Sequence, residues 1–329
     1  MLDIFKKINL QLFAEPGTNV TTDAGLSVEN KTHYDMTLID EAGPQLVHDQ
    51  FAQKRPIPKN GGKKINFRKF ASLPKATQPL TEGVTPDGKK LSATAIEAEV
   101  AQYGDYVVMS DMLDLTSIDP IVVEATKVCG RQAGLTLDTI TRNILHSGTN
   151  VYYAPKADGT VVESRSALDA TCKLTVDVVR RVAAILKKNN APKIDGSYAA
   201  IIHPFAAYDL MSDPEWQYPH QYKDTENIYE GEIGKIAGVR FVETSEAKIY
   251  EGGVFGTLFI ADGAYGTTEI TGGGLRTIIK QLGSAGVADP LDQRSSVGWK
   301  ATKTAEILME AYLMRVEHKS AFSDQVEAN

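Results

Sequence analysis

Apolar residues between positions 120 and 148 recur every three or four residues and predict the longest helix of the chain. Asp119 can cap the first turn, Pro120 needs no partner for its missing N–H there, and Gly148 can end the helix. At about 1.5 Å per residue, a helix over 120–147 would be roughly 42 Å long. One apolar stripe runs along it: Ile121, Ala125, Cys129, Ala133, Leu137, Ile140 and Ile144.

Two further segments have helical spacing. The segment 175–188 predicts an amphipathic helix that ends on Lys187 and Lys188, where cations favour the helix dipole. The segment 35–53 also fits a helix, although Gly43-Pro44 interrupts its apolar face. Within the long helix, Gly130 and Gly134 lower the intrinsic helix propensity. We therefore expect packing along its length to stabilise that helix.

Other segments alternate between apolar and polar residues and predict strands. One short run contains Ile65 and Phe67, and a second covers 96–100 with its glutamates on the opposite face. From Val297 to Leu313 the odd positions are apolar except for Lys303, which predicts a long strand although the residue types there favour helix. Three short buried strands are also expected, at 198–202, 239–242 and 257–261.

Length and composition are those of an ordinary soluble globular protein, with 329 residues, 42% hydrophobic and 23% charged. Cys129 and Cys172 are far apart and lack a CxxC motif, which excludes a disulfide framework and suits a reducing compartment. No apolar run approaches the roughly 20 residues of a membrane helix, so we expect no membrane partner. Asp3 precedes Lys6 and Lys7 at the start, which favours an N-terminal arm over a signal peptide.

Charge is distributed unevenly along the chain. The net charge is −7, yet residues 50–81, here called the basic ribbon, contain eight Lys or Arg and no Asp or Glu. The ribbon is punctuated by proline and glycine, and a lone hairpin of this kind buries little surface. Three interpretations are open: a nucleic-acid patch with few aromatic side chains to stack on bases, a solvated hairpin, or an arm that lies on another copy of the chain.

Motifs for catalysis or for metal and cofactor binding are not recognisable in the sequence. The six histidines have no metal-binding spacing, and the glycine clusters near 231, 252 and 272 lack the Walker pattern of a phosphate loop. His203, followed by Pro204 after a buried strand, is the one histidine placed as a catalytic residue could be, and a structural role is the simpler interpretation. We predict no catalytic residue, no metal and no cofactor.

Five segments together resemble the major capsid proteins of tailed bacteriophages, in the group typified by the podophage N-four. The INLQLFAE start is similar to that of phage structural proteins as well. The resemblance covers nearly the whole chain, in order. Its segments are TLIDEAGPQLVHDQFAQKRPIPKNGGKKINFRKF (37–70), LTEGVTPDGKKLS (80–92), YGDYVVMSDMLDLT (103–116), QAGLTLDTITRNIL (132–145) and VGWKATKTAEIL (297–308).

The resemblance implies an α+β fold of the Hong Kong 97 type, with an N-terminal arm, an extended hairpin called the E-loop, a peripheral domain with a long spine helix, and an axial domain. Carried onto this chain, it places the N-terminal arm and lead-in helix at 1–53 and the E-loop at 54–104. The peripheral domain with its spine helix would cover 105–170, the axial domain 171–290, and the return to the peripheral domain 291–329.

For function, the resemblance implies a shell protein that self-assembles through hexamers and pentamers into the icosahedral head of a tailed phage. Implied partners are double-stranded DNA held non-specifically, a portal and a separate scaffolding protein, with assembly in the bacterial cytoplasm and residence in the virion capsid. An encapsulin-like nanocompartment shell is the alternative, and an enzyme is a third class. No motif assigns a covalent crosslink. The cations expected to contact a neighbouring subunit are Lys59, Lys63, Lys64, Arg68, Lys69 and Lys75.

Overall fold

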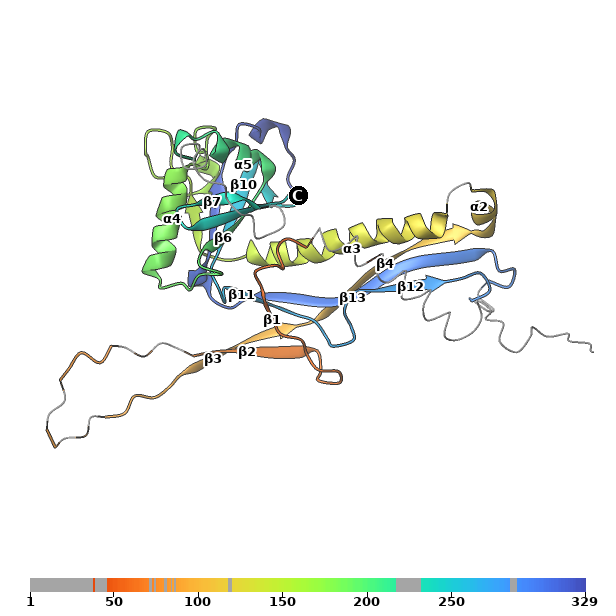
Figure 1. The fold of residues 1–329 in the computed structure, drawn as a ribbon, viewed down its shortest axis with the longest axis horizontal. Coiled ribbons are helices and arrows are strands. Elements are labelled where there is room, and N and C mark those ends of the chain that lie inside the picture. The colour runs from red at the N-terminus through yellow and green to blue at the C-terminus, as the bar shows by residue number, and fades with distance from the viewer. Residues whose placement is uncertain are drawn as a thin grey trace, which may run out of the picture.

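The computed structural model describes Leu38 and residues 46–70, 73, 75–79, 82–83, 85, 87–117, 120–216, 232–284 and 289–329. Figure 1 shows an elongated molecule with a globular body at one end of a long helix and a hairpin that projects away from the rest. Within the described residues, the strands form a five-stranded, a seven-stranded and a two-stranded sheet.

The long helix is α3, Ile121–Leu145, and it packs on the five-stranded sheet. The predicted apolar stripe is confirmed: Cys129, Ala133 and Leu137 are buried, and the other stripe residues are partly buried. Pro120 occupies the N-cap position, and Asp119, expected to cap the helix, lies outside the described residues. Residues of the sheet that share this core are Met109, Val297, Trp299 and Ala301.

The five-stranded sheet is organised around its longest strand, β13, Arg294–Ile307. The edge strand β4, Ala101–Ser110, pairs antiparallel with β13 over Lys303 to Arg294. Along the other side of β13 lie β12, Arg276–Lys280, and then β11, Tyr265–Thr268. The two-residue strand β1, Gln53–Lys54, adds to β11 in parallel.

The globular body contains the seven-stranded sheet, in the order β5-β14-β10-β6-β8-β7, with β9 also paired to β10. The helices α4, Val176–Lys188, and α5, Pro204–Met211, contribute to its main core. The strands are β5 Val151–Tyr153, β6 Tyr198–Ile202, β7 Glu232–Ile236, β8 Val239–Glu243, β9 Ile249–Tyr250, β10 Val254–Ile260 and β14 Leu313–His318.

The predicted strands and the helix over 175–188 are confirmed, with one difference near the C-terminus. The strand expected to run from Val297 to Leu313 ends at Ile307, and a 3-10 turn, Glu310–Tyr312, separates it from β14. This turn carries the chain from the five-stranded to the seven-stranded sheet, so the period of two continues into a second sheet. Two more 3-10 turns are Arg165–Ala167 and Ser323–Gln325.

The helix predicted over 35–53 is wrong in its described C-terminal part. Residues 48–52 form a turn and a bend before β1, and residues 39–45 lie outside the described residues. Tertiary bonds replace the helical ladder here: the backbone N–H of His48 donates to Asp138 at 2.8 Å, and the Tyr265 hydroxyl donates to the carbonyl of His48. Most of the N-terminal arm expected over 1–53 falls outside the described residues.

Sheet membership does not follow the expected domain boundaries. Strand β14 lies in the seven-stranded sheet although 291–329 was expected to be peripheral, and β11 and β12 lie in the five-stranded sheet although 171–290 was expected to be axial. The assignment of domains remains a proposal. We favour a division into two bodies. The peripheral body would contain α3 and the five-stranded sheet, with residues 265–307, and the axial body would contain the seven-stranded sheet, with Leu313–His318.

Candidate assembly surfaces

The hairpin that projects from the molecule consists of β2, Lys64–Phe70, and β3, Ala93–Glu99. The two strands pair antiparallel in full register and form a sheet of their own (Figure 1). Between positions 54 and 104, the buried apolar side chains among the described residues are Ile57, Phe67, Ala98 and Val100. The rest of the described hairpin is exposed or half-buried, as expected for an extended E-loop.

The base of the hairpin is anchored on the five-stranded sheet. The Phe67 ring is 3% exposed and lies over Gly266 of β11, where an added Cβ would stand 2.9 Å from Phe67 Cε1. The Arg55 guanidinium lies 5.8 Å from the centre of the same ring. The backbone N–H of Ile57 donates to the carbonyl of Glu269 at 2.8 Å. These contacts fix the direction in which the hairpin leaves the body.

All six predicted contact cations, Lys59, Lys63, Lys64, Arg68, Lys69 and Lys75, are exposed. Lys64 and Arg68 share one face of β2, whereas Phe67 occupies the other face, on the side of the five-stranded sheet. Lys64 contacts Glu97 and Glu99 across the hairpin, and the hydrogen bond with Glu97 raises the pKa of the Lys64 ammonium. The glutamates of β3 thus balance part of the positive charge of the basic ribbon. Pairing the two predicted strands residue by residue would have revealed this from the sequence.

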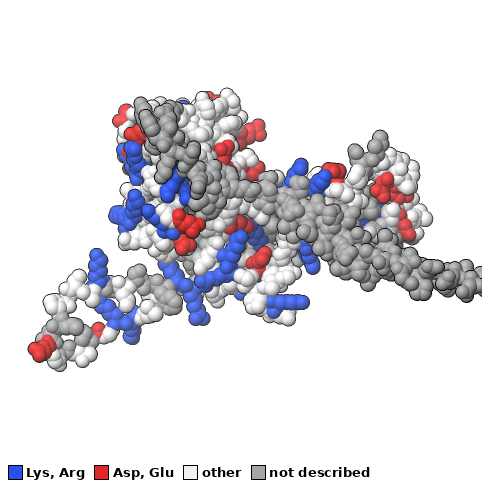
Figure 2. Space-filling view, in the orientation of Figure 1, with Lys and Arg blue, Asp and Glu red and all other residues white. Residues whose placement is uncertain are grey.

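The N-terminal end of the spine helix α3, away from the globular body, carries a different surface, here called the tip surface. It consists of α2, Asp111–Thr116, the end of β4 and the first turns of α3. A groove of about 510 Å³ runs between β4 and α3, lined mainly by apolar side chains. Asp111 and Asp114 add negative charge on α2. Figure 2 shows acidic side chains at this end of the molecule, basic ones along the hairpin and beside it, and acidic ones again at the far end of the hairpin. Exposed large apolar residues of the tip surface are Val107, Val108, Met112, Leu113, Leu115 and Val128.

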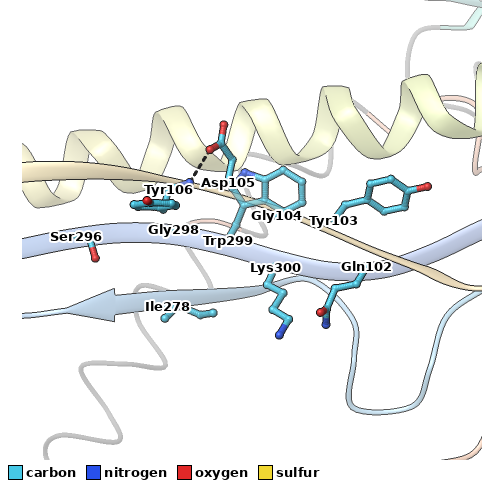
Figure 3. A pocket seen from close by; sticks show the side chains of 10 residues that line it. All are labelled: Gln102, Tyr103, Gly104, Asp105, Tyr106, Ile278, Ser296, Gly298, Trp299 and Lys300. Atoms are coloured by element: carbon cyan, nitrogen blue, oxygen red, sulfur yellow. Dashed lines mark hydrogen bonds between the residues drawn. The ribbon is translucent and has the colours of Figure 1, made fainter. Parts of the chain in front are cut away.

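A second hollow, of about 410 Å³, borders β4, β13 and β12 (Figure 3). Gly104 and Gly298 line it, and both lie so close to the neighbouring strand that an added Cβ would stand 2.6 Å and 2.7 Å from the nearest atom. Tyr106 pairs with Gly298 across the strands and is 68% exposed. Such an aromatic side chain over a glycine supports the register of an edge strand.

Beside this hollow, Gln132 ties α3 to the sheet. The Gln132 amide donates to Asp105 at 2.6 Å and accepts from the Trp299 indole N–H at 3.2 Å. The hydrogen bond from Gln132 lowers the pKa of the Asp105 carboxyl, with help from the backbone N–H of Tyr106. This arrangement positions the edge strand and holds no group poised for catalysis.

His203, the one histidine considered for catalysis, has a structural role. Its Nδ1 accepts the backbone N–H of Phe205 at 3.1 Å and so caps α5. The ring lies 5.0 Å from the centres of the Phe205 and Phe255 rings, and burial lowers the pKa of His203 to about 4. Among the described residues, no group of three or more His, Cys, Asp or Glu could hold a metal ion. Nor does any described helix have the length and apolarity to cross a membrane.

Comparison with known families and structures agrees with this geometry. A family model described as phage capsid protein matches residues 120–270. The chain is 14% identical to the capsid of cyanophage P-SCSP1u, with a TM-score of 0.62 over 84% of this chain and 89% of that one. It is 14% identical to the capsid of Ralstonia phage GP4, with a TM-score of 0.64 over 83% and 88%.

A virus-like particle from Pyrococcus furiosus is also similar, at 10% identity and a TM-score of 0.51 over 88% of this chain and 99% of that one. The comparison with curated proteins found no match. Identities this low show the fold, and that fold is the Hong Kong 97 type expected from the sequence.

Proposed function

We infer that this chain, which has the fold of phage capsid proteins and matches their family model over residues 120–270, is the major capsid protein of a tailed bacteriophage. It is a structural subunit of the virion capsid. Its work is to associate with copies of itself into capsomers and to close an icosahedral head.

The projecting hairpin is the observation that supports this proposal most directly. A two-stranded sheet is marginal on its own because it buries too little apolar surface. Here β2 and β3 contact the body at their base through Phe67, and most of the described side chains beyond that base remain exposed. A neighbouring subunit would supply the missing contacts, and the exposed cations from Lys59 to Lys75 would face it.

The charges of the subunit favour a head-to-tail contact. Basic side chains predominate along the hairpin, although its far end is acidic, and the tip surface carries acidic side chains (Figure 2), so the basic length of one copy's hairpin would meet opposite charge on the tip of the next. Like ends would repel, which disfavours hairpin-to-hairpin pairing. The apolar groove beside α2 would give such a contact a buried centre inside a charged rim.

The assembly of a phage head involves further partners. We propose that hexamers and pentamers of this chain enclose double-stranded DNA, held without sequence preference, and that a portal and a separate scaffolding protein take part in assembly inside the bacterial cytoplasm. We propose a structural and not a catalytic role for the chain, because its fold is that of capsid proteins.

An encapsulin-like nanocompartment shell is the second candidate, and the virus-like particle from Pyrococcus furiosus is the observation in its favour. Its TM-score of 0.51 is lower than the 0.62 and 0.64 obtained with two phage capsids. The phage head is therefore the better supported function.

Electron microscopy of the expressed full chain, alone and together with its neighbouring gene products, tests the proposal. We expect capsomers or closed shells, and a portal-bearing head when a portal and scaffold are present. A small oligomer under every condition would contradict it. Shells that enclose one specific enzyme and never incorporate a portal would support the nanocompartment instead.

A charge-reversal variant tests the role of the ribbon. The triple variant Lys63→Glu, Arg68→Glu and Lys69→Glu should fold, because all three side chains are exposed, and should fail to assemble. The matched control is Lys193→Glu, Lys235→Glu and Arg276→Glu, which changes the net charge equally on exposed residues outside the ribbon. Equal assembly of both triple variants would show that the ribbon does not form the contact.

A further inference from the structure

A buried polar cluster lies where the C-terminal end of α3 meets the seven-stranded sheet. His146, the C-cap residue of α3, is buried, and its ring packs directly on β10, where a Cβ at Gly256 would stand 2.7 Å from His146 Cε1. Its Nδ1 lies 3.0 Å from the Tyr250 hydroxyl, next to β10. Its Nε2 is buried and has no hydrogen-bond partner.

The same junction is bridged by Arg315 of β14. Its guanidinium donates to the carbonyls of His146 and Gly148, which are among the last carbonyl groups of the α3 end. A cation at this position is favoured by the helix dipole and satisfies backbone acceptors. The ring of His146 and the guanidinium of Arg315 therefore hold the same end of the helix against the same sheet.

Basic side chains face the His146 ring from four segments of the chain. Arg142 faces it from α3, Lys248 from the segment before β9, Arg315 from β14, and His48 from the turn before β1. The nearby carboxylates are already engaged. Glu246 contacts Arg142, Glu317 contacts Arg165 and Arg315, and Asp138 contacts His48.

We propose that His146 is a proton-sensitive latch, whose neutral ring keeps the end of α3 docked on the seven-stranded sheet and whose protonation releases that end. A protonated ring would add one more cation to a buried site that has no carboxylate left for it. The inference concerns the isolated subunit and does not depend on the proposed function.

The titration of His146 agrees with this geometry. Burial lowers the pKa of His146 well below its ordinary value, and repulsion from His48, Arg315, Arg142 and Lys248 lowers it further. A histidine whose pKa is depressed in the docked state favours docking at neutral pH. That contribution is lost progressively as the pH falls below about 6.5, the value for an unperturbed histidine.

Hydrogen exchange of the full chain between pH 7.5 and 4.5 tests the latch, after correction for the intrinsic pH dependence of exchange. The opening equilibrium of peptides from 138–148 and 248–258 should rise together, by about tenfold per pH unit below about 6.5, because one proton is taken up on opening. Peptides from 126–134, in the middle of α3, should not change. A pH-independent opening of the junction would overturn the proposal.

The variant His146→Gln keeps a polar side chain that cannot take up the proton, and it should remove the pH dependence of the junction. His318→Gln is the control: it changes a second buried histidine, whose ring contacts Phe255 and Thr257 of β10, and peptides from 138–148 should retain their pH dependence in it. An unchanged slope in His146→Gln would overturn the proposal. If that variant fails to fold, the NMR titration of the His146 ring in the wild type decides. A ring that protonates near pH 6.5 without any rise in exchange would refute the latch.

Discussion

The Phe67 ring lies on the bare backbone of Gly266, and this contact joins the projecting hairpin to the five-stranded sheet. The two residues belong to strands of different sheets, and there is no room between them for a methyl group, since a Cβ at 266 would stand 2.9 Å from Phe67 Cε1. The hairpin's direction, and hence where it meets a neighbour, depends on that close approach.

Gly266→Ala should therefore displace Phe67 and loosen the hairpin. We expect a loss of about 1–3 kcal/mol in the free energy of unfolding, as is usual for overpacking, together with reduced assembly. Denaturant titration and hydrogen exchange of residues 64–70 measure the two effects. Gly88→Ala is the control, because an added Cβ there meets nothing within 4 Å. Equal stability of the two variants would mean that the contact is not tight.

Assembly should weaken with salt, because the basic hairpin would approach an acidic tip across exposed, screened surfaces. The screening length falls from about 10 Å at 0.1 M to about 3 Å at 1 M ionic strength. We expect the rate of capsomer formation, followed by light scattering, to fall over this range. A rate that is unchanged in molar salt would assign the contact to apolar burial alone.

The ion pair between Lys303 and Asp49 tethers the turn before β1 to β13 in the interior. The side chains are 9% and 16% exposed, and the second oxygen of Asp49 accepts the Thr141 hydroxyl at 2.8 Å. Lys303→Met would leave a buried carboxylate without its cation, at an expected loss of about 3–5 kcal/mol. The double variant Lys303→Met, Asp49→Asn should recover part of that loss, measured by denaturant unfolding.

The exposed pair Lys127 and Glu124 on α3 provides the comparison. Its side chains are 36% and 56% exposed, so Lys127→Met should change the free energy of unfolding by about 1 kcal/mol or less. If Lys303→Met were as mild as Lys127→Met, the Asp49 carboxylate would have to be hydrated in the folded protein.

Elements with a sustained period could be predicted from the sequence, and contacts between distant segments could not. The alternation in β13 identified a strand against its helical propensity, because the strand buries one face on α3. The turn at 48–52 was predicted as helix, since nothing local encodes the bond from His48 to Asp138, 90 residues away. The cluster around His146 escaped notice for the same reason: its members come from four separate elements.

The charge balance of the hairpin was within reach of the sequence. Both of its strands were predicted, and pairing them in register sets Lys64 opposite Glu99. The basic ribbon, residues 50–81, includes β2 but not β3. The whole hairpin is less basic than the ribbon because β3 contributes glutamates that the count over 50–81 leaves out. The tip surface could not be predicted because the sequence shows apolar residues in β4, α2 and α3 but does not show which of them another element leaves exposed.

Substitutions on two faces of the spine helix α3 should separate effects on folding from effects on assembly. Leu137 is 5% exposed and shares a core with Trp299 and Ala301 of β13. Leu137→Asp would bury an unpaired carboxylate, which costs several kcal/mol. Whole domains are stable by only about 5–15 kcal/mol. We expect little soluble protein and a weakened helical signal in circular dichroism.

Val128 lies on the same helix, is 59% exposed and lines the groove of the tip surface. Val128→Asp should fold like the wild type, since its carboxylate stays in water, and should still impair assembly if the groove is a contact between copies. Loss of soluble protein in both variants would mean that α3 has no exposed face at this end. Normal assembly of Val128→Asp would remove the groove from the interface while leaving the packing of α3 on β13 intact.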